Sequence, residues 1–260
     1  MTSQKMIFFD IDGTLLDEEK QLPISTKQAI TRLKELGHLV AIATGRSPFN
    51  LYKLMDELEL DTYVSFNGQY VVIEGNVIYK NPLDSTTLRA LTEYSLDQKH
   101  PLIYMDHEDM RSNYESHPHV DEAIGSLKVD HPVTFDPHFY KDREIYQSLL
   151  FCTDDHQESY RREFSQFDFI RWHQFSTDVL PQGGSKAKGI EEAIRHLGIK
   201  DENVYAFGDG LNDIEMLKYV HNSVAMGNAP ELVKNTAKYV TKHVDNDGIL
   251  HGLELVGLLK

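Results

Sequence analysis

The sequence predicts an α/β protein: a Rossmann-like core with an open, mostly parallel sheet and an inserted α+β domain. In the first and last thirds of the chain, short apolar runs that end at polar residues alternate with segments of helical apolar spacing. This alternation is typical of βαβ units, which build parallel sheets covered by helices. Between these thirds the pattern becomes irregular, and proline and glycine residues stand at both ends of the irregular stretch.

The first third predicts three strands, two helices and a hairpin. Met6–Phe9 is an apolar run that ends at a carboxylate, as a buried parallel strand does. A helix begins near Ser25 and ends at Gly37, a typical helix stop. The elements expected next are a strand over 39–43, a helix opened by Ser47 and Pro48, a strand over 63–66, and a hairpin of 70–73 with 77–79.

The last third repeats the alternation. A helix with apolar residues at helical spacing begins near Lys186 and is terminated by Gly198. The elements expected after it are a strand over 204–207, a short helix near Asn212, strands over 223–226 and 239–241, and between these a helix that opens at Pro230. The change of pattern therefore predicts a core of 1–82 and 183–260 and an inserted domain of 83–182.

The charge of the chain limits its partners. The formal net charge is −15, from 41 acidic and 26 basic residues. A field of this sign repels nucleic acid and anionic membrane surfaces, so we expect neither as a partner. The single cysteine, Cys152, excludes an intramolecular disulfide, and the N-terminus lacks the apolar stretch of a signal peptide. We therefore expect a cytoplasmic protein.

Two carboxylates, Asp10 and Asp12, follow the first predicted strand, at the edge where open α/β sheets place their sites. If the chain stays extended, side chains two residues apart point to one side. Such a pair can hold Mg²⁺, which prefers oxygen ligands, or can divide the roles of nucleophile and general acid/base. A polar exit from a strand into a loop is the alternative, and for this pair alone it is the better interpretation.

Three further segments offer groups that suit a phosphate or a metal. Thr44 ends the second strand, where its hydroxyl and backbone N–H can contact a phosphate oxygen. Lys186 stands at a helix start, a position that favours an anion, although a solvated surface lysine is the simpler interpretation of it alone. Asp209 and Asp213 can converge on one cation, with a helix-capping cluster as the alternative. Together, a cation and Lys186 would supply the positive charge that a phosphate site needs in so acidic a chain.

The order and spacing of these segments resemble the haloacid dehalogenase superfamily, and within it the Cof-like branch of sugar-phosphate and small-metabolite phosphatases. The four motifs of that branch are matched by Asp10 to Thr14, Thr44-Gly45-Arg46, the lysine at the end of 181–186, and Gly208 to Asp213. Three secondary signatures are matched by 65–68, 226–229 and 246–249. The resemblance covers the first and last thirds of the chain, the predicted core.

The resemblance implies a mechanism and a Mg²⁺ cofactor. Asp10 would attack phosphorus in line and form an aspartyl-phosphate. Asp12 would protonate the leaving oxygen and then activate the water that hydrolyses this intermediate. The metal would be held by Asp10, the backbone carbonyl of Asp12, and Asp209, with Asp213 nearby or holding the ion indirectly.

The resemblance also implies the substrate class and the groups that bind it. The substrate would be a small phosphorylated metabolite, such as a sugar phosphate or a nucleotide. Thr44 and Lys186 would bind the transferring phosphoryl group, and Asn212 would help to position it. Gly45 and Arg46 would either contact the substrate or have a structural role, and the two interpretations have equal weight. The inserted domain would be a cap that closes over the site and chooses the leaving group.

Two other functions stay open at this point. A phosphomutase of the same superfamily would return the phosphoryl group to substrate instead of to water. A catalytically silent regulator would bind a phosphorylated metabolite without turnover. His117, His119 and His131 match no standard zinc spacing, and Pro118 and Pro132 predict solvated loop histidines there.

Overall fold

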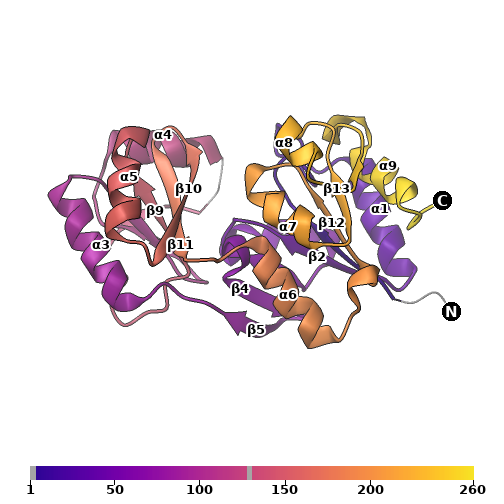
Figure 1. The fold of residues 1–260 in the computed structure, drawn as a ribbon, viewed down its shortest axis with the longest axis horizontal. Coiled ribbons are helices and arrows are strands. Elements are labelled where there is room, and N and C mark those ends of the chain that lie inside the picture. The colour runs from indigo at the N-terminus through magenta and orange to yellow at the C-terminus, as the bar shows by residue number, and fades with distance from the viewer. Residues whose placement is uncertain (1–3, 128–130) are drawn as a thin grey trace. The chain divides into compact units, whose positions relative to one another are not determined.

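The computed structural model describes residues 4–127 and 131–260, and their contacts divide the chain into two compact units (Figure 1). Unit 1 consists of Met1–Gly45, Lys53–Tyr79 and Ser185–Lys260, and unit 2 consists of Arg46–Tyr52 and Lys80–Gly184. The segment 46–52, which the predicted boundaries assign to the core, groups with unit 2. The division into a core and an inserted domain at 83–182 stays a prediction.

Unit 1 is built on an eight-stranded sheet with the order β14-β13-β12-β1-β2-β3-β4-β5. Neighbouring strands from β14 to β3 run parallel, and β4 pairs antiparallel with β3. The bounds are β1 Met6–Phe9, β2 Leu39–Ala43, β3 Tyr63–Ser65, β4 Tyr70–Ile73, β5 Asn76–Lys80, β12 Val204–Gly208, β13 Asn222–Ala225 and β14 Tyr239–Val240. The predicted open, mostly parallel sheet is confirmed.

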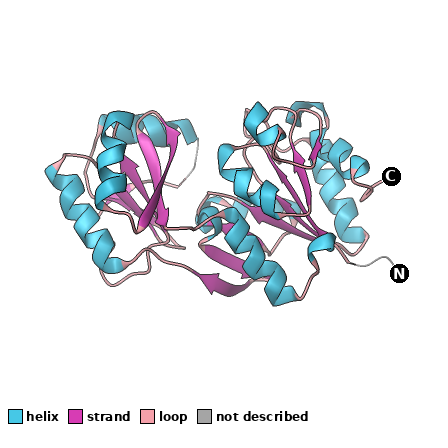
Figure 2. Ribbon diagram, in the orientation of Figure 1, coloured by secondary structure: helices cyan, strands magenta, loops and turns pink. Residues whose placement is uncertain are grey.

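Helices cover both faces of this sheet (Figure 2), and its central strands β1, β2 and β12 are mostly apolar and buried. On one face Phe8 packs in a core with Ile190 of α6 and Leu217 of α7. On the other, Gly252 of α9 lies against the ring of Phe207, where a Cβ would be 2.6 Å from Cε1. The helices of unit 1 are α1 Ile24–Glu35, α2 Tyr52–Leu58, α6 Lys186–Leu197, α7 Ile214–Tyr219, α8 Glu231–Lys234 and α9 Gly248–Leu255, with the first residue of α2 grouped in unit 2.

Two local predictions need correction. The helix expected from Ser47 is a single 3₁₀ turn over Pro48–Asn50, and α2 begins only at Tyr52. The third strand ends at Ser65, one residue early, because Phe66 has a φ of 49° and Asn67 a φ of 50°. Left-handed backbone of this kind cannot continue a strand.

Unit 2 is an α+β unit with a six-stranded sheet of order β10-β11-β9-β6-β7-β8. Its pairs are antiparallel except for β7 with β8. Its strands are β6 Leu102–Met105, β7 Met110–Ser112, β8 Thr134–Phe135, β9 Gln147–Phe151, β10 Phe167–His173 and β11 Ser176–Pro181, and its helices are α3 Ser85–Asp97, α4 Pro118–Leu127 and α5 Asp154–Glu163. Leu88, Tyr104, Leu150 and Tyr160 belong to its core.

The expectation of solvated loop histidines is wrong for His119. Pro118 begins α4 rather than a turn, as proline at a first helical position does. His119 is half-buried and stacks on the ring of Phe175 with a centroid distance of 4.1 Å. Within 4–127 and 131–260 the histidines form no metal-ligating group. In the same ranges no helix has the length and apolar character needed to cross a membrane.

Candidate active site

Four of the predicted site residues meet at the carboxyl ends of β1 and β12. Asp10 follows β1, Asp209 follows β12, and Lys186 is the first residue of α6. One carboxylate oxygen each from Asp10, Asp209 and Asp213 lies within 4.8 Å of the other two. The adjacent parallel strands bring their ends to one edge of the sheet, so residues nearly 200 positions apart form a single acidic cluster.

Lys186 lies between two of these carboxylates. Its Nζ donates to Oδ1 of Asp10 and to Oδ1 of Asp213, both at 2.6 Å. Lys186 and Asp213 are fully buried and Asp10 nearly so. The interpretation of Lys186 as a surface lysine is therefore wrong. Gly189, one turn along α6, permits this depth because a Cβ there would lie 2.4 Å from Cγ1 of Val64.

The cluster carries more negative charge than one ammonium balances. Burial, together with the charges of Asp213 and Asp209, raises the pKa of Asp10 to about 8 although Lys186 lowers it. Burial by itself lowers the pKa of Lys186, but Asp10 and Asp213 outweigh this effect and the pKa is raised above its ordinary value. Burial also raises the pKa of Asp209 to about 6. A buried group of three carboxylates with one lysine suits an additional cation.

The donor set fits a hard divalent ion. The three clustered oxygens are all carboxylate oxygens, the ligands that Mg²⁺ prefers, and no sulfur or imidazole ligand belongs to the group within the described residues. The side chain of Asp12 is not a member of this group. Asp12 could therefore serve such an ion only through its backbone carbonyl, which is the ligand that the family resemblance implies.

Asp12 stands at the turn that follows β1, where it forms an isolated bridge with Leu16. Backbone N–H groups of Thr14 and Leu16 both donate to the carbonyl of Ile11, which folds 11–16 into a turn. Oδ1 of Asp12 accepts from Nζ of Lys20 at 2.6 Å. Asp10 joins the cluster and Asp12 pairs with Lys20, and the charge of Asp12 still raises the pKa of both Asp10 and Asp209.

The Asp209 carboxylate is held by two side chains, Thr14 and Asn228, which lie in matched motifs but were not predicted as site residues. Oγ1 of Thr14 donates to Oδ1 of Asp209 at 2.8 Å. Nδ2 of Asn228 donates to Oδ2 of Asp209 at 3.2 Å and to the carbonyl of Gly13 at 2.8 Å, while its Oδ1 accepts from the backbone N–H of Val244. Gly13 has a φ of 82°, and a Cβ there would lie 2.3 Å from Oδ2 of Asp209. Only glycine allows this approach.

Asp213 orders the loop that carries Asp209. Its Oδ2 accepts from the backbone N–H groups of Asp209 at 2.9 Å and Gly210 at 2.8 Å. Because its Oδ1 accepts from Lys186, one carboxylate joins the loop to the cluster. The capping role weighed for Asp213 and its role in the charged cluster therefore coexist.

The remaining predicted residues follow two strands of the sheet: Thr44, Gly45 and Arg46 come after β2, and Asn212 comes after β12. The backbone N–H of Thr44 donates to the carbonyl of Val64, so the sheet uses the amide that was offered to a phosphate. Nδ2 of Asn212 donates to Oδ1 of Asn67 at 3.2 Å. A Cβ on Gly45 would approach Oδ1 of Asn67 to 3.0 Å. Arg46 is half-buried and belongs to unit 2.

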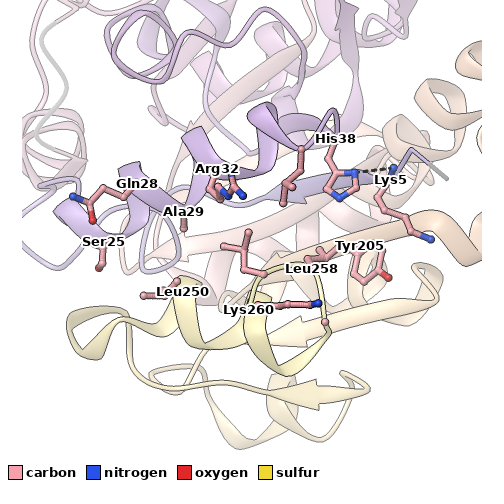
Figure 3. Close-up of a pocket in the computed structure, with 13 residues that line it drawn as sticks. Lys5, Ser25, Gln28, Ala29, Arg32, His38, Tyr205, Leu250, Leu258 and Lys260 are labelled. Atoms are coloured by element: carbon pink, nitrogen blue, oxygen red, sulfur yellow. Dashed lines mark hydrogen bonds between the residues drawn. The ribbon is translucent and has the colours of Figure 1, made fainter. Parts of the chain in front are cut away.

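A pocket of about 620 Å³ in unit 1 is separate from this cluster (Figure 3). It lies beside α1 and α9 and the starts of β1 and β12, with Arg32, His38 and Leu258 among its lining residues. The cluster lies at the other ends of those strands, and none of the predicted site residues lines the pocket. The chemistry that the sequence indicates is therefore not placed in this cavity.

Comparisons with known proteins agree with the cluster. A family model described as haloacid dehalogenase-like hydrolase matches residues 7–253. YkrA of Bacillus subtilis (strain 168), named as a candidate phosphatase, is 49% identical over 256 residues, which cover 98% of this chain and 99% of that protein. A hypothetical protein of Geobacillus kaustophilus HTA426 has a crystal structure that is 55% identical, with a TM-score of 0.94 and coverage of 99% of this chain and 100% of that one. A structure of the HAD subclass IIB sugar phosphatase BT4131 is 33% identical, with a TM-score of 0.87 and coverage of 98% and 100%.

Proposed function

This chain belongs to the haloacid dehalogenase-like hydrolases and is a phosphatase, and from that premise we propose that it hydrolyses small phosphomonoesters with Mg²⁺ through a phosphoryl intermediate on Asp10. The observation that carries the proposal is the convergence of Asp10, Asp209 and Asp213 around Lys186. The cluster then offers a nucleophilic carboxylate, a set of oxygen ligands for a metal, and a buried ammonium. Phosphoryl transfer needs all three close together.

Asp10 is the proposed nucleophile. One carboxylate oxygen attacks phosphorus as the bond from phosphorus to the leaving oxygen breaks, which gives an aspartyl-phosphate. Lys186, 2.6 Å from Asp10, supplies positive charge beside the oxygens of the transferring group. The hydroxyl of Thr44, at the end of the adjacent β2, and the amide of Asn212 complete the proposed phosphate contacts.

Asp12 is the proposed general acid and base. Its carboxylic acid gives a proton to the leaving alkoxide, so the first product departs as an alcohol. The resulting carboxylate then takes a proton from a water molecule as the water oxygen attacks phosphorus. Asp10 leaves as a free carboxylate, inorganic phosphate is released, and the proton on Asp12 restores the starting state.

Mg²⁺ is the proposed cofactor. Asp10, Asp209 and Asp213 would hold it through their side chains, and Asp12 would add its backbone carbonyl. When bound, the ion supplies charge that offsets the negative charge of the phosphate and of this cluster. Thr14 and Asn228 restrain Asp209 through hydrogen bonds, so that ligand is already oriented.

The proposed substrates are sugar phosphates, nucleotides or similar metabolites. The likeness to a sugar phosphatase supports the first of these. The inserted domain, 83–182, is proposed as the cap that selects the leaving group. The proposal also includes a cytoplasmic enzyme without nucleic-acid or membrane partners, and the net charge of −15 supports the absence of such partners.

A substrate panel tests the proposal. Purified protein is assayed on sugar phosphates, nucleotides and p-nitrophenyl phosphate, with Mg²⁺ and with a chelator, and both free phosphate and isomerised sugar phosphate are measured. We expect metal-dependent phosphate release that Asp10→Asn abolishes. Isomerisation without phosphate release would favour the phosphomutase. Binding of a phosphorylated metabolite without any turnover would favour the silent regulator.

A further inference from the structure

The ion pair between Lys20 and Asp12 joins the proposed general acid to a residue outside every predicted motif. Nζ of Lys20 lies 2.6 Å from Oδ1 of Asp12, and the two side chains are 31% and 39% exposed. Asp10 is paired in the same way with Lys186, also at 2.6 Å. The two carboxylates of the motif therefore have separate lysines, one buried and one half-exposed.

A short turn brings Lys20 to this place. The backbone N–H of Asp17 donates to the carbonyl of Gln21, and the N–H of Lys20 donates to the carbonyl of Asp17. Oδ1 of Asp17 accepts from the N–H of Gln21 at 2.8 Å. Asp17 thus binds the far end of the turn through its backbone and its side chain. The ammonium of Lys20, near that end, reaches back eight residues along the chain to Asp12.

The backbone at Lys20 is strained for a residue with a side chain. Its φ is 61°, in the left-handed region where turns of this kind usually carry glycine. That conformation costs more free energy than a half-exposed ion pair normally returns. Seven other non-glycine residues of the described chain also have a positive φ, so the angle alone marks no function. What distinguishes Lys20 is its contact with the proposed acid.

From this geometry we propose that Lys20 is a positioning residue for the reaction: it holds the carboxylate of Asp12 where that group exchanges protons with the leaving oxygen and with water. The inference rests on the proposed function, because it assumes that Asp12 moves those protons. In this role Lys20 contacts neither phosphorus nor the carboxylates of Asp10, Asp209 and Asp213, which would hold the metal. Its loss should therefore harm only the steps in which a proton moves.

Three variants separate this role from a structural one. Lys20→Gly removes the ammonium and at the same time suits the left-handed backbone, so the turn keeps its shape. Lys20→Arg keeps a cation of similar reach. Lys99→Gly is the matched control, because Lys99 is also a lysine with a left-handed φ, 59°, but is exposed and lies in unit 2.

The experiment compares kcat/KM for two esters in the presence of Mg²⁺. One is the alkyl phosphate that the wild-type enzyme hydrolyses fastest, whose leaving group needs a proton; the other is p-nitrophenyl phosphate, whose leaving group does not. For Lys20→Gly we expect a loss of about 10- to 100-fold on the alkyl phosphate and of less than about threefold on the aryl ester. Lys20→Arg should recover most of the loss, and Lys99→Gly should match the wild type on both.

Three outcomes would overturn the inference. The first is a Lys20→Gly enzyme that matches the wild type on the alkyl phosphate. The second is an equal loss on both esters, or a rise in KM alone, which would assign Lys20 to the structure or to substrate binding. The third is a Lys20→Gly effect that persists in an Asp12→Asn background. Absence of turnover by the wild-type enzyme on every ester would instead reject the proposed function itself.

Discussion

Gly68 and Ser185 approach each other so closely that a Cβ built on Gly68 would lie 2.0 Å from the carbonyl oxygen of Ser185. Ser185 is the cap of α6, whose first residue is Lys186. The loop after β3 therefore fixes where α6 begins. It thereby also fixes the position of the buried ammonium of Lys186. Gly68 also has a φ of 99°, so both the space and the backbone require glycine.

Gly68→Ala should destabilise the protein and reduce turnover. The added methyl group meets backbone, which cannot move aside, and the backbone conformation is unfavourable, so we expect a loss of more than about 3 kcal/mol in the free energy of unfolding. Gly75→Ala is the control, because its φ of 73° is similar but nothing lies within 4 Å of the added atom. It should cost about 1 kcal/mol. Equal losses in urea unfolding would show that the contact with Ser185 is unimportant.

Lys186→Met should unfold far more easily than the wild type in metal-free buffer. Removal of the ammonium leaves Asp10 and Asp213 buried without it, a change that typically costs about 3–5 kcal/mol. Lys188→Met removes a lysine whose ion pairs with Glu191 and Glu192 lie at the surface, so its effect should be much smaller. Urea unfolding of both variants checks this difference. A small effect at residue 186 would mean that the pairs seen here do not stabilise the fold.

Asp10→Asn should lose turnover while the protein remains folded. An amide is a poor nucleophile, so we expect phosphate release to fall by at least about 10³-fold. Lys186 keeps Asp213 as a partner in this variant, and circular dichroism should therefore match the wild type. A variant with a near-normal rate would remove Asp10 from the mechanism.

Asp12→Asn and Asp209→Asn should fail for different reasons. Asp12 contributes no side chain to the acidic cluster, so its variant should bind Mn²⁺, as a stand-in for Mg²⁺, with wild-type affinity while kcat falls by about 10²–10⁴-fold. Asp209→Asn removes one of the clustered carboxylates, and its affinity for the ion should fall by about tenfold or more. Titration calorimetry with Mn²⁺ separates the two. Similar affinities in both variants would contradict this division.

The stability of unit 2 should fall on acidification because of His100. Burial, together with the nearby imidazoles, lowers the pKa of His100 from 6.5 to about 4; the groups that face it are His156, His119, His117, Asp155 and the hydroxyl of Tyr160. Between these two pKa values the unfolded chain binds a proton that the native state refuses. The stability that depends on a neutral His100 is therefore fully present above about pH 6.5 and is lost as the pH falls towards 4.

His100→Asn should flatten this dependence. The loss of stability between pH 7 and pH 4.5 should be smaller than in the wild type by about 1 kcal/mol, less than the full linkage value because the ring is partly exposed. Thermal unfolding across this range is the measurement. His138→Asn, at an exposed position, should leave the wild-type dependence intact. Parallel curves for wild type and His100→Asn would assign the acid sensitivity to other groups.

The part of the site that follows from local pattern could be predicted from the sequence. β1 and β2 have the predicted bounds, because a buried parallel strand is an apolar run that stops at polar residues. Asp10 and Thr44 therefore stand where expected. The burial of Asp213 could not be predicted, because it depends on a contact with Lys186 at a separation of 27 residues. The pair of Lys20 with Asp12 depends on a left-handed backbone angle, for which a lysine gives no sequence signal.

The hydrogen bonds of Asn228 restrict that position to a neutral amide. Its Nδ2 donates to the carbonyl of Gly13 and to Oδ2 of Asp209, and its Oδ1 accepts from the N–H of Val244. An aspartate of the same shape could donate to neither oxygen and would face Asp209 with a like charge. Conversion of this asparagine to aspartate would therefore weaken the restraint on Asp209 and place a like charge beside it.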